Sequence, residues 1–87
     1  MKLDDRTLRL IAVGASVTAN CQPCLQINMA KALESGADEQ EIAAAIQVGK
    51  MVRQGAASKM DKFASSLNQM PLLAASLATE ECGCGAN

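Results

Sequence analysis

The clearest capacity for chemistry in this sequence lies in two cysteines, Cys21 and Cys24, separated by two residues in the stretch NCQPC. Thiols at this spacing can close a disulfide, bind a metal ion or remain reduced in a hydrophobic core. The chain contains no histidine, the side chain that most often serves proteins as a base near neutral pH and as a metal ligand. Only the sequence around Cys21 and Cys24 can therefore indicate which of these three roles the pair has.

A second pair, Cys82 and Cys84, lies in the stretch ECGCGAN. The neighbouring glycines give the backbone the freedom that a disulfide between such close cysteines requires. One interpretation is a tethered dithiol that exchanges electrons with Cys21 and Cys24. A second is a zinc or iron–sulfur centre held by all four thiolates, although the two pairs are further apart than in zinc ribbons. The third is a tail whose cysteines have no special role.

Composition limits the partners. The 87 residues carry a net charge of −1 and include one aromatic side chain, a phenylalanine. Binding to nucleic acid by charge and base stacking would need a basic surface and aromatic platforms, so no nucleic acid is expected. The apolar run from Leu10 to Ala19 is too short to cross a bilayer, and Asp4 and Asp5 spoil the positive start of a signal peptide. We expect a soluble, cytoplasmic protein with no membrane contact.

The core has to be built almost entirely from aliphatic side chains, because the chain has no Trp or Tyr. Aromatic residues contribute the largest buried areas, and a short chain without them is marginally stable alone. We therefore expect a homo-oligomer. In a reducing compartment, paired cysteines are more often catalytic or metal-binding than structural.

Helical patterns dominate, and no alternating run long enough for a strand is present, so we predict an all-α fold. The first helix is expected to run from Asp4 or Asp5 to about Thr18. The second is expected to run from an N-cap at Asn20 to a stop at Ser35–Gly36. The expected buried face of the first helix comprises Leu10, Val13 and Val17, with Gly14 allowing a close neighbour.

A third helix is expected from an N-cap at Asp38 to about Gly55. Residues 1–79 are expected to form one helical domain, and residues 80–87 a flexible tail that carries Cys82 and Cys84. The predicted buried face of the third helix comprises Ile42, Ala45, Ile46 and Gly49. A fourth helix is expected to carry Met60, Phe63, Leu67 and Met70 at a spacing typical of core packing, and Pro71 to precede a short last helix with Leu72, Leu73 and Leu77.

The predicted N-cap at Asn20 places Cys21 in the first turn of the second helix, beside unpaired amides and the positive end of the helix dipole. That environment lowers the pKa of a thiol by stabilising its thiolate. Cys24 follows one turn later on the same face, close enough to form a disulfide. No βαβ pattern surrounds the motif, so the structural context of thioredoxin is missing. These features favour a redox-active pair, with a metal site and inert thiols as the alternatives.

The segment ANCQPCLQINMAKALESGADEQEIAAAIQVGKMVRQGAASKMDKF resembles the core of the AhpD-like alkylhydroperoxidases, in the carboxymuconolactone decarboxylase superfamily. The resemblance covers roughly Leu8 to Phe63. It rests on the CxxC at a helix start, the ALESGADEQEI turn between helices, and the small-residue helix that follows. It implies an all-helical, oligomeric protein whose dithiol reduces peroxides and is reduced again by a thioredoxin-like or lipoamide-type partner.

The motif of those peroxidases is an upstream Glu, then CxxC, then a His four residues after the second Cys. By resemblance, Cys24 is the thiol that attacks the peroxide and Cys21 the more exposed resolving thiol. The His position is occupied by Asn28 and the Glu position falls on or near Arg9. Neither replacement supplies the acid–base group that the attacking thiol and the leaving alkoxide need, although Arg9 could stabilise a thiolate.

The sequence therefore predicts a thiol–disulfide redox protein that reduces peroxides, weakly because the family Glu and His are absent, with catalytic Cys21 and Cys24 and auxiliary Asn28, Arg9, Cys82 and Cys84. No cofactor and no bound metal are expected. The alternatives are a small metal-binding or sensing module built on the four cysteines, and a catalytically degenerate member with a structural role. Decarboxylation is not expected, because it would require a base such as His.

Overall fold

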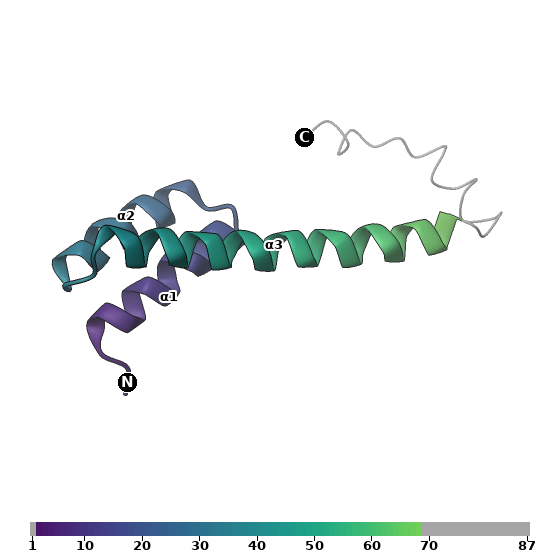
Figure 1. Ribbon diagram of the computed structural model, residues 1–87. Coiled ribbons are helices and arrows are strands. Elements are labelled where there is room, and N and C mark those ends of the chain that lie inside the picture. The colour runs from purple at the N-terminus through teal and green to yellow at the C-terminus, as the bar shows by residue number, and fades with distance from the viewer. Residues whose placement is uncertain (1, 69–87) are drawn as a thin grey trace. The chain divides into compact units, whose positions relative to one another are not determined.

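The computed structural model describes residues 2–68, and the regular elements in this range are helices. They are α1 (Asp5–Thr18), α2 (Gln22–Glu34) and α3 (Glu39–Asn68), as Figure 1 shows. The predicted all-α fold is confirmed. The expected last helix around Leu72–Leu77 and the expected tail at residues 80–87 lie outside the described residues. None of the described helices combines the length and the apolar character needed to cross a membrane.

Aspartate side chains cap α1 and α3, as the sequence predicts. The Thr7 amide donates to Asp4 Oδ1 at 2.8 Å, and this bond lowers the pKa of the Asp4 carboxyl because it stabilises the charged form. At α3, the Glu41 amide donates to Asp38 Oδ1 at 2.8 Å and the Asp38 amide donates to Glu41 Oε1 at 3.1 Å. This reciprocal capping box satisfies two amides that would otherwise lack partners.

A left-handed residue ends each of the first two helices. Asn20 ends α1 with φ 58° and Gly36 ends α2 with φ 98°. At α1 the Asn20 amide donates to Val17 O and the Cys21 amide to Ser16 O, both at 3.0 Å, which is a Schellman motif. The predicted N-cap at Asn20 is therefore wrong. Asn20 terminates α1, and Cys21 takes the N-cap position of α2.

A small core joins the three helices within residues 1–56, which form one unit of the chain. Its fully buried members come from α1, α2, the α2–α3 turn and α3, and the predicted faces of the first and third helices contribute to it. The buried residues are Val13, Ala32, Ala37 and Ile42, and the half-buried residues packed against them are Leu10, Leu25, Met29, Ala45 and Ile46.

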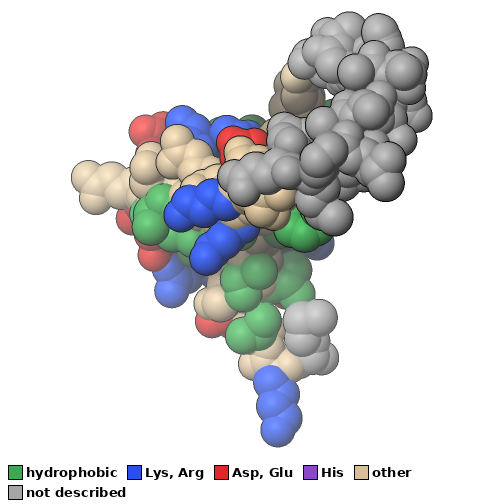
Figure 2. All heavy atoms as spheres, turned by 90° about the vertical axis from the view of Figure 1, so that its right-hand side faces the viewer, with side chains coloured by type: hydrophobic (Ala, Val, Ile, Leu, Met, Phe, Trp, Pro, Cys, Tyr) green, Lys and Arg blue, Asp and Glu red, His purple; other side chains and the backbone are tan. Residues whose placement is uncertain are grey.

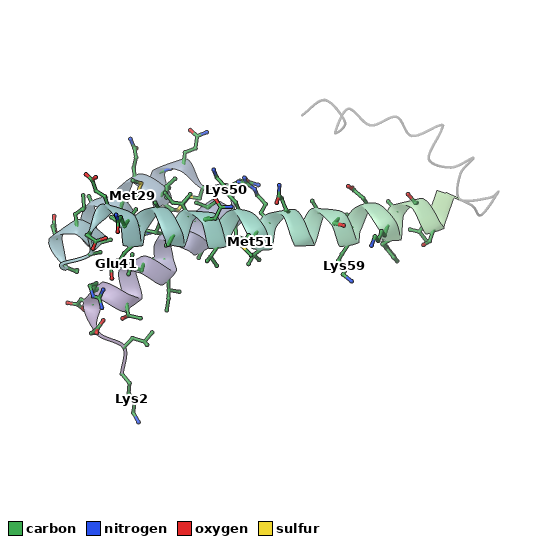
Figure 3. All side chains as sticks on the ribbon, viewed as in Figure 1. Lys2, Met29, Glu41, Lys50, Met51 and Lys59 are labelled. Atoms are coloured by element: carbon green, nitrogen blue, oxygen red, sulfur yellow. A yellow bond between two sulfur atoms is a disulfide. The ribbon has the colours of Figure 1, made fainter. Side chains whose placement is uncertain are left out.

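Two glycines allow α1 and α3 to approach closely. A Cβ placed on Gly49 would lie well inside van der Waals contact of the Gly14 carbonyl and 2.9 Å from the Val17 Cβ, and one placed on Gly14 would lie 3.0 Å from Ala45 O. The Thr18 hydroxyl also donates to Gly49 O at 2.9 Å. At the other end of α1, Arg6 forms an ion pair with Glu41, the residue labelled near the start of α3 in Figure 3.

The predicted break at Gly55 is wrong, because α3 continues from Glu39 to Asn68. A single glycine costs a helix only about 1 kcal/mol relative to alanine, and the alanines that follow Gly55 favour the helix. The second unit of the chain begins at Ala57 and is described only as far as Asn68. There Met60 and Phe63 are 62% and 58% exposed in the single chain, so they do not pack in its core. Whether they pack between subunits, as an oligomer would allow, stays a prediction.

Replacing Gly49 with alanine should lower the free energy of unfolding by about 1–3 kcal/mol, the range typical of an overpacked core, because the added methyl group meets the Gly14 backbone. Gly55→Ala is the matched control on the same helix. A Cβ at Gly55 meets nothing within 4 Å, so this change should raise stability by up to about 1 kcal/mol. Urea denaturation of both variants measures the difference, and equal effects would contradict the close approach of α1 and α3.

Candidate functional site

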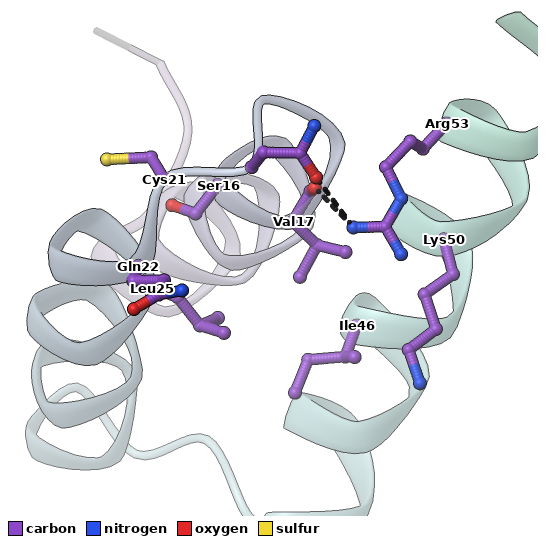
Figure 4. Close-up of a pocket in the computed structure, with 9 residues that line it drawn as sticks. Ser16, Val17, Cys21, Gln22, Leu25, Ile46, Lys50 and Arg53 are labelled. Carbon is purple, nitrogen blue, oxygen red and sulfur yellow. Dashed lines mark hydrogen bonds between the residues drawn. The ribbon is translucent and has the colours of Figure 1, made fainter. Parts of the chain in front are cut away.

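The α1–α2 corner fixes the position of the first cysteine. The Schellman bonds turn the chain at Asn20 and place Cys21 directly after the turn. Arg53 of α3 reinforces the corner from outside, since its Nη1 donates to Val17 O at 3.2 Å and to Asn20 Oδ1 at 3.0 Å, as Figure 4 shows. The residue before the dithiol is therefore tied to both α1 and α3.

Cys21 and Cys24 are joined by a disulfide, with their Cα atoms 5.3 Å apart. Cys21 is the N-cap of α2 and Cys24 is its third helical residue, so the bond spans the first turn. Pro23 fits between them because the first turn of a helix leaves its amides without intrahelical partners. The predicted proximity of the two thiols is confirmed.

The exposure of the two cysteines differs from the expectation carried over by resemblance. Cys21 is half-buried and Cys24 is exposed, whereas Cys21 was expected to be the more exposed thiol. The reason is the corrected corner. The backbone amide of Cys21 donates a hydrogen bond to Ser16 O, which holds Cys21 against α1. Cys24 lies one turn further along α2. Cys24 is thus the more accessible residue of the pair in the single chain.

The N-cap position also determines which amide can stabilise a thiolate. No side chain caps α2, and its second residue is Pro23, which has no amide proton. In the reduced protein the Cys21 sulfur can therefore accept a hydrogen bond from the Cys24 amide, at the third helical position where N-cap side chains normally accept. Together with the positive end of the helix dipole, such a bond favours a thiolate at Cys21 once the disulfide is reduced.

By resemblance, Asn28 falls on the His position of the peroxidase motif and Arg9 on or near the Glu position. These two residues lie together, with Asn28 in contact with the backbone of Cys24. Arg9 Nη1 donates to Asn28 Oδ1 at 3.3 Å. Asn28 Nδ2 donates to the Cys24 carbonyl at 2.9 Å and to Ser16 Oγ at 3.4 Å. The hydroxyl of Ser16, which is only 5% exposed, donates in turn to Ala12 O at 2.7 Å. The replacements are hydrogen-bonded to one another and hold the backbone of Cys24.

This network orients groups but moves no protons near neutral pH. Asn28 and Ser16 are neutral, and a guanidinium offers hydrogen-bond donors but no acceptor. A thiol beside these groups can be positioned, and its thiolate can be stabilised by the positive charge of Arg9. It cannot be deprotonated by them. The arrangement therefore suits reactions of a preformed thiolate better than reactions that need general acid–base catalysis.

Sequence reasoning missed two residues of this site, Ser16 and Arg53. Ser16 lies three residues after buried Val13 in an otherwise apolar run, and a polar residue on a buried face was a usable signal. Arg53 lies one turn after Gly49, so its presence on the α1-facing side of α3 could have been inferred. Its bonds to the α1–α2 corner depend on the approach of two distant segments.

The metal alternative receives no support from the described residues. In residues 2–68, no group of three or more Cys, Asp or Glu side chains is close enough to hold a metal ion. The alternative four-cysteine site requires Cys82 and Cys84, which lie outside the described residues, as does any electron exchange with that pair. Their predicted roles stay predictions.

The family of this chain is shown by a comparison with protein-family models. The model of the carboxymuconolactone decarboxylase family matches residues 1–64. The chain belongs to this family. The match includes all of α1 and α2 and most of α3, and it confirms the resemblance to the AhpD-like superfamily. Comparisons with curated proteins and with solved structures gave no match.

In this member of the carboxymuconolactone decarboxylase family, restoring the base should change the reactivity of the reduced dithiol. Asn28→His should accelerate the reaction with hydrogen peroxide by about a hundredfold and give the rate a pH dependence near 6.5, the usual pKa of His. Adding Arg9→Glu should raise the rate further, because the carboxylate lies where Arg9 now contacts residue 28 and raises the pKa of the new His. Stopped-flow kinetics across pH measures both effects.

The matched control is Gln26→His, which adds the same side chain to an exposed position of α2. It should leave the rate and its pH profile unchanged. Fast turnover of the unaltered protein that Asn28→His does not increase would contradict the prediction, and would mean that Arg9 and the helix end already supply enough thiolate.

Proposed function

We propose that this protein is a thiol–disulfide redox protein that works through Cys21 and Cys24. The observation that carries the proposal is the disulfide across the first turn of α2, with Cys24 exposed to reactants. A disulfide in such a position can be attacked from solvent, and the helix end favours the thiolate that leaves. Membership of the carboxymuconolactone decarboxylase family and its AhpD-like superfamily supports the same chemistry.

The reducing half of the cycle is thiol–disulfide exchange. A thiolate of the partner attacks the exposed Cys24 sulfur, forms a mixed disulfide with it and breaks the Cys21–Cys24 bond, so that Cys21 leaves as a thiolate. The second thiolate of the partner then attacks the partner sulfur that is bonded to Cys24, and Cys24 is released as a thiolate. The partner is oxidised to a disulfide, and the chain gains two electrons and two protons. A dithiol partner of the thioredoxin-like or lipoamide type fits this stoichiometry.

The oxidising half uses a peroxide in the family-implied reaction. The Cys24 thiolate attacks one peroxide oxygen and becomes a sulfenic acid, while the other oxygen leaves as an alcohol or as water after protonation. Cys21 then attacks the Cys24 sulfur, forms the disulfide and releases water. Because an amide and a guanidinium replace the acid–base groups that the motif uses for this step, the leaving oxygen takes its proton from solvent. We therefore propose weak peroxide reduction and more efficient disulfide exchange.

The decarboxylation in the family's name is not proposed for this chain. That reaction would need a base such as His, and the sequence has none. The hydrogen-bonded groups at the backbone of Cys24 are an amide, a hydroxyl and a guanidinium, which bind and orient without supplying a general base.

The redox proposal is tested by counting free thiols and metal in protein purified without reductant. The Cys21–Cys24 disulfide should open with dithiothreitol and close again with peroxide or oxidised dithiol, changing the thiol count by two per chain. Cys24→Ser should abolish this change, and the double variant Cys82→Ser, Cys84→Ser should retain it. One zinc or iron per chain that is lost in the double variant would overturn the proposal in favour of the metal-binding alternative.

We also propose that the chain associates with copies of itself. The fully buried core is small, and several large apolar side chains are exposed, as the space-filling view in Figure 2 shows for one face. A groove of about 440 Å³ between α1 and α3 is lined by Ile11, Val48 and Val52 among others. These three side chains are 54–56% exposed in the single chain, and a second copy would cover them and enlarge the core.

Light scattering at micromolar concentration should therefore show an oligomer that Val48→Lys weakens or dissociates, because the charge would be buried in the apolar contact. Ile27→Lys is the matched control. Ile27 is 54% exposed on α2 and does not line the groove, so this change should leave the assembly intact. A well-folded monomer of the unaltered chain would contradict the proposal.

A further inference from the structure

A cavity of about 280 Å³ lies beside the dithiol, and its lining combines apolar and cationic side chains. Val17, Leu25 and Ile46 provide the apolar part, and Lys50 and Arg53 of α3 provide the positive charge. Among the described residues that line it, none is acidic. Sites for drug-sized ligands begin at about this volume, so the cavity suits a small molecule with an apolar body and a negative group.

The two cations are available to such a ligand. Arg53 is half-buried, and its bonds to Val17 O and Asn20 Oδ1 both use Nη1. These bonds hold the guanidinium in place and leave its other nitrogens to donate. Lys50 lies one turn earlier on α3, and Figure 4 shows it on the same side of the helix as Ile46 and Arg53. In the described part of the chain, neither cation forms an ion pair.

We propose that this cavity binds a small aliphatic carboxylate, with its carboxylate at Lys50 and Arg53 and its hydrocarbon part against Val17, Leu25 and Ile46. Arg donors match the geometry of a carboxylate and can bind it with two parallel hydrogen bonds. Removal of the hydrocarbon part from water contributes the rest of the affinity. An inorganic anion would gain only the first of these two contributions.

Occupancy of the cavity is coupled to the redox state of the dithiol, and this part of the inference rests on the proposed function. Cys21 lines the same cavity, while Figure 4 shows its sulfur directed away from Arg53. The ligand therefore acts on the sulfur through its charge and not through contact. Reduction creates a thiolate that repels the nearby carboxylate. The carboxylate binds the disulfide form more tightly, and by reciprocity it protects the disulfide from reduction.

Binding is tested on the oxidised full-length protein with hexanoate as the probe, followed by NMR chemical shifts and calorimetry at pH 7. Hexanoate should bind, and its neutral analogue hexanamide should bind about tenfold more weakly, as expected for loss of a charged hydrogen bond. Lys50→Gln should weaken hexanoate about threefold without touching the bonds that Arg53 makes to the corner. Lys31→Gln, an exposed charge on α2 outside the cavity, should change nothing.

Three outcomes of the binding measurement would overturn the site. They are no binding of hexanoate, equal binding of hexanamide, and binding of inorganic phosphate as tight as that of hexanoate. Either of the first two would show that the cavity does not recognise a carboxylate. The third would show that the hydrocarbon part of the ligand contributes nothing to binding. The variant Cys24→Ser, which alters no residue of the cavity lining, should still bind hexanoate, so the site is tested independently of any redox activity.

The coupling is tested by repeating the titration on protein reduced with dithiothreitol, which is uncharged. The dissociation constant should rise by about twofold or more, the effect of one added charge at a distance of several ångströms in water. Equal affinity in the two states would overturn the coupling and leave the binding site standing. A dithiol that cannot be reduced and reoxidised would overturn the proposed function and also leave the binding site standing.

Discussion

The left-handed corner at Asn20 is the constraint on which the site depends. The turn ends α1 and lets α2 start at once, so Cys21 becomes an N-cap without any intervening loop. The left-handed conformation costs Asn20 little free energy, because Asn adopts it more readily than most residues other than glycine. The two Schellman hydrogen bonds and the hydrogen bond from Arg53 to the Asn20 side chain offset this cost. Anything that relaxes this corner moves the first sulfur relative to the helix end that stabilises it.

The Gly14–Gly49 approach makes the reinforcement by Arg53 possible. Because α3 lies so close to α1, Arg53, one turn beyond Gly49, can reach the carbonyl of Val17 and the side chain of Asn20. A larger residue at either glycine would push the helices apart and withdraw the guanidinium from the corner. A substitution that disturbs the packing of α1 against α3 therefore also disturbs the geometry of the site. Because the core is small, the chain has little free energy of folding to compensate for such a change.

Sequence reasoning succeeded where the signal was local. Asp4 and Asp38 are of a residue type preferred as an N-cap. The helical spacing of apolar residues marks the buried faces, which include Val13 and Val17 on α1 and Ile42 on α3. It failed at Asn20 because Asn is favoured both as an N-cap and as a left-handed terminator, and the two roles differ by one residue in the position of the next helix. It failed at Gly55 because a glycine breaks a helix only when other interactions favour the break. The cationic cavity depends on contacts between residues more than 30 positions apart, which no local pattern reports.

The charges around the dithiol decide which chemistry the site can support. Arg9 lies on the side of Asn28 and Cys24, while Lys50 and Arg53 line the cavity beside Cys21. Every charged side chain in these two groups is a cation. Such surroundings stabilise a thiolate once it has formed, but they leave its proton, and that of a departing alkoxide, to the solvent. Exchange between sulfur atoms requires a thiolate and access to it, whereas peroxide cleavage also requires a proton at the leaving oxygen. We therefore expect the absence of Glu and His to weaken any peroxide reduction by this chain more than it weakens disulfide exchange.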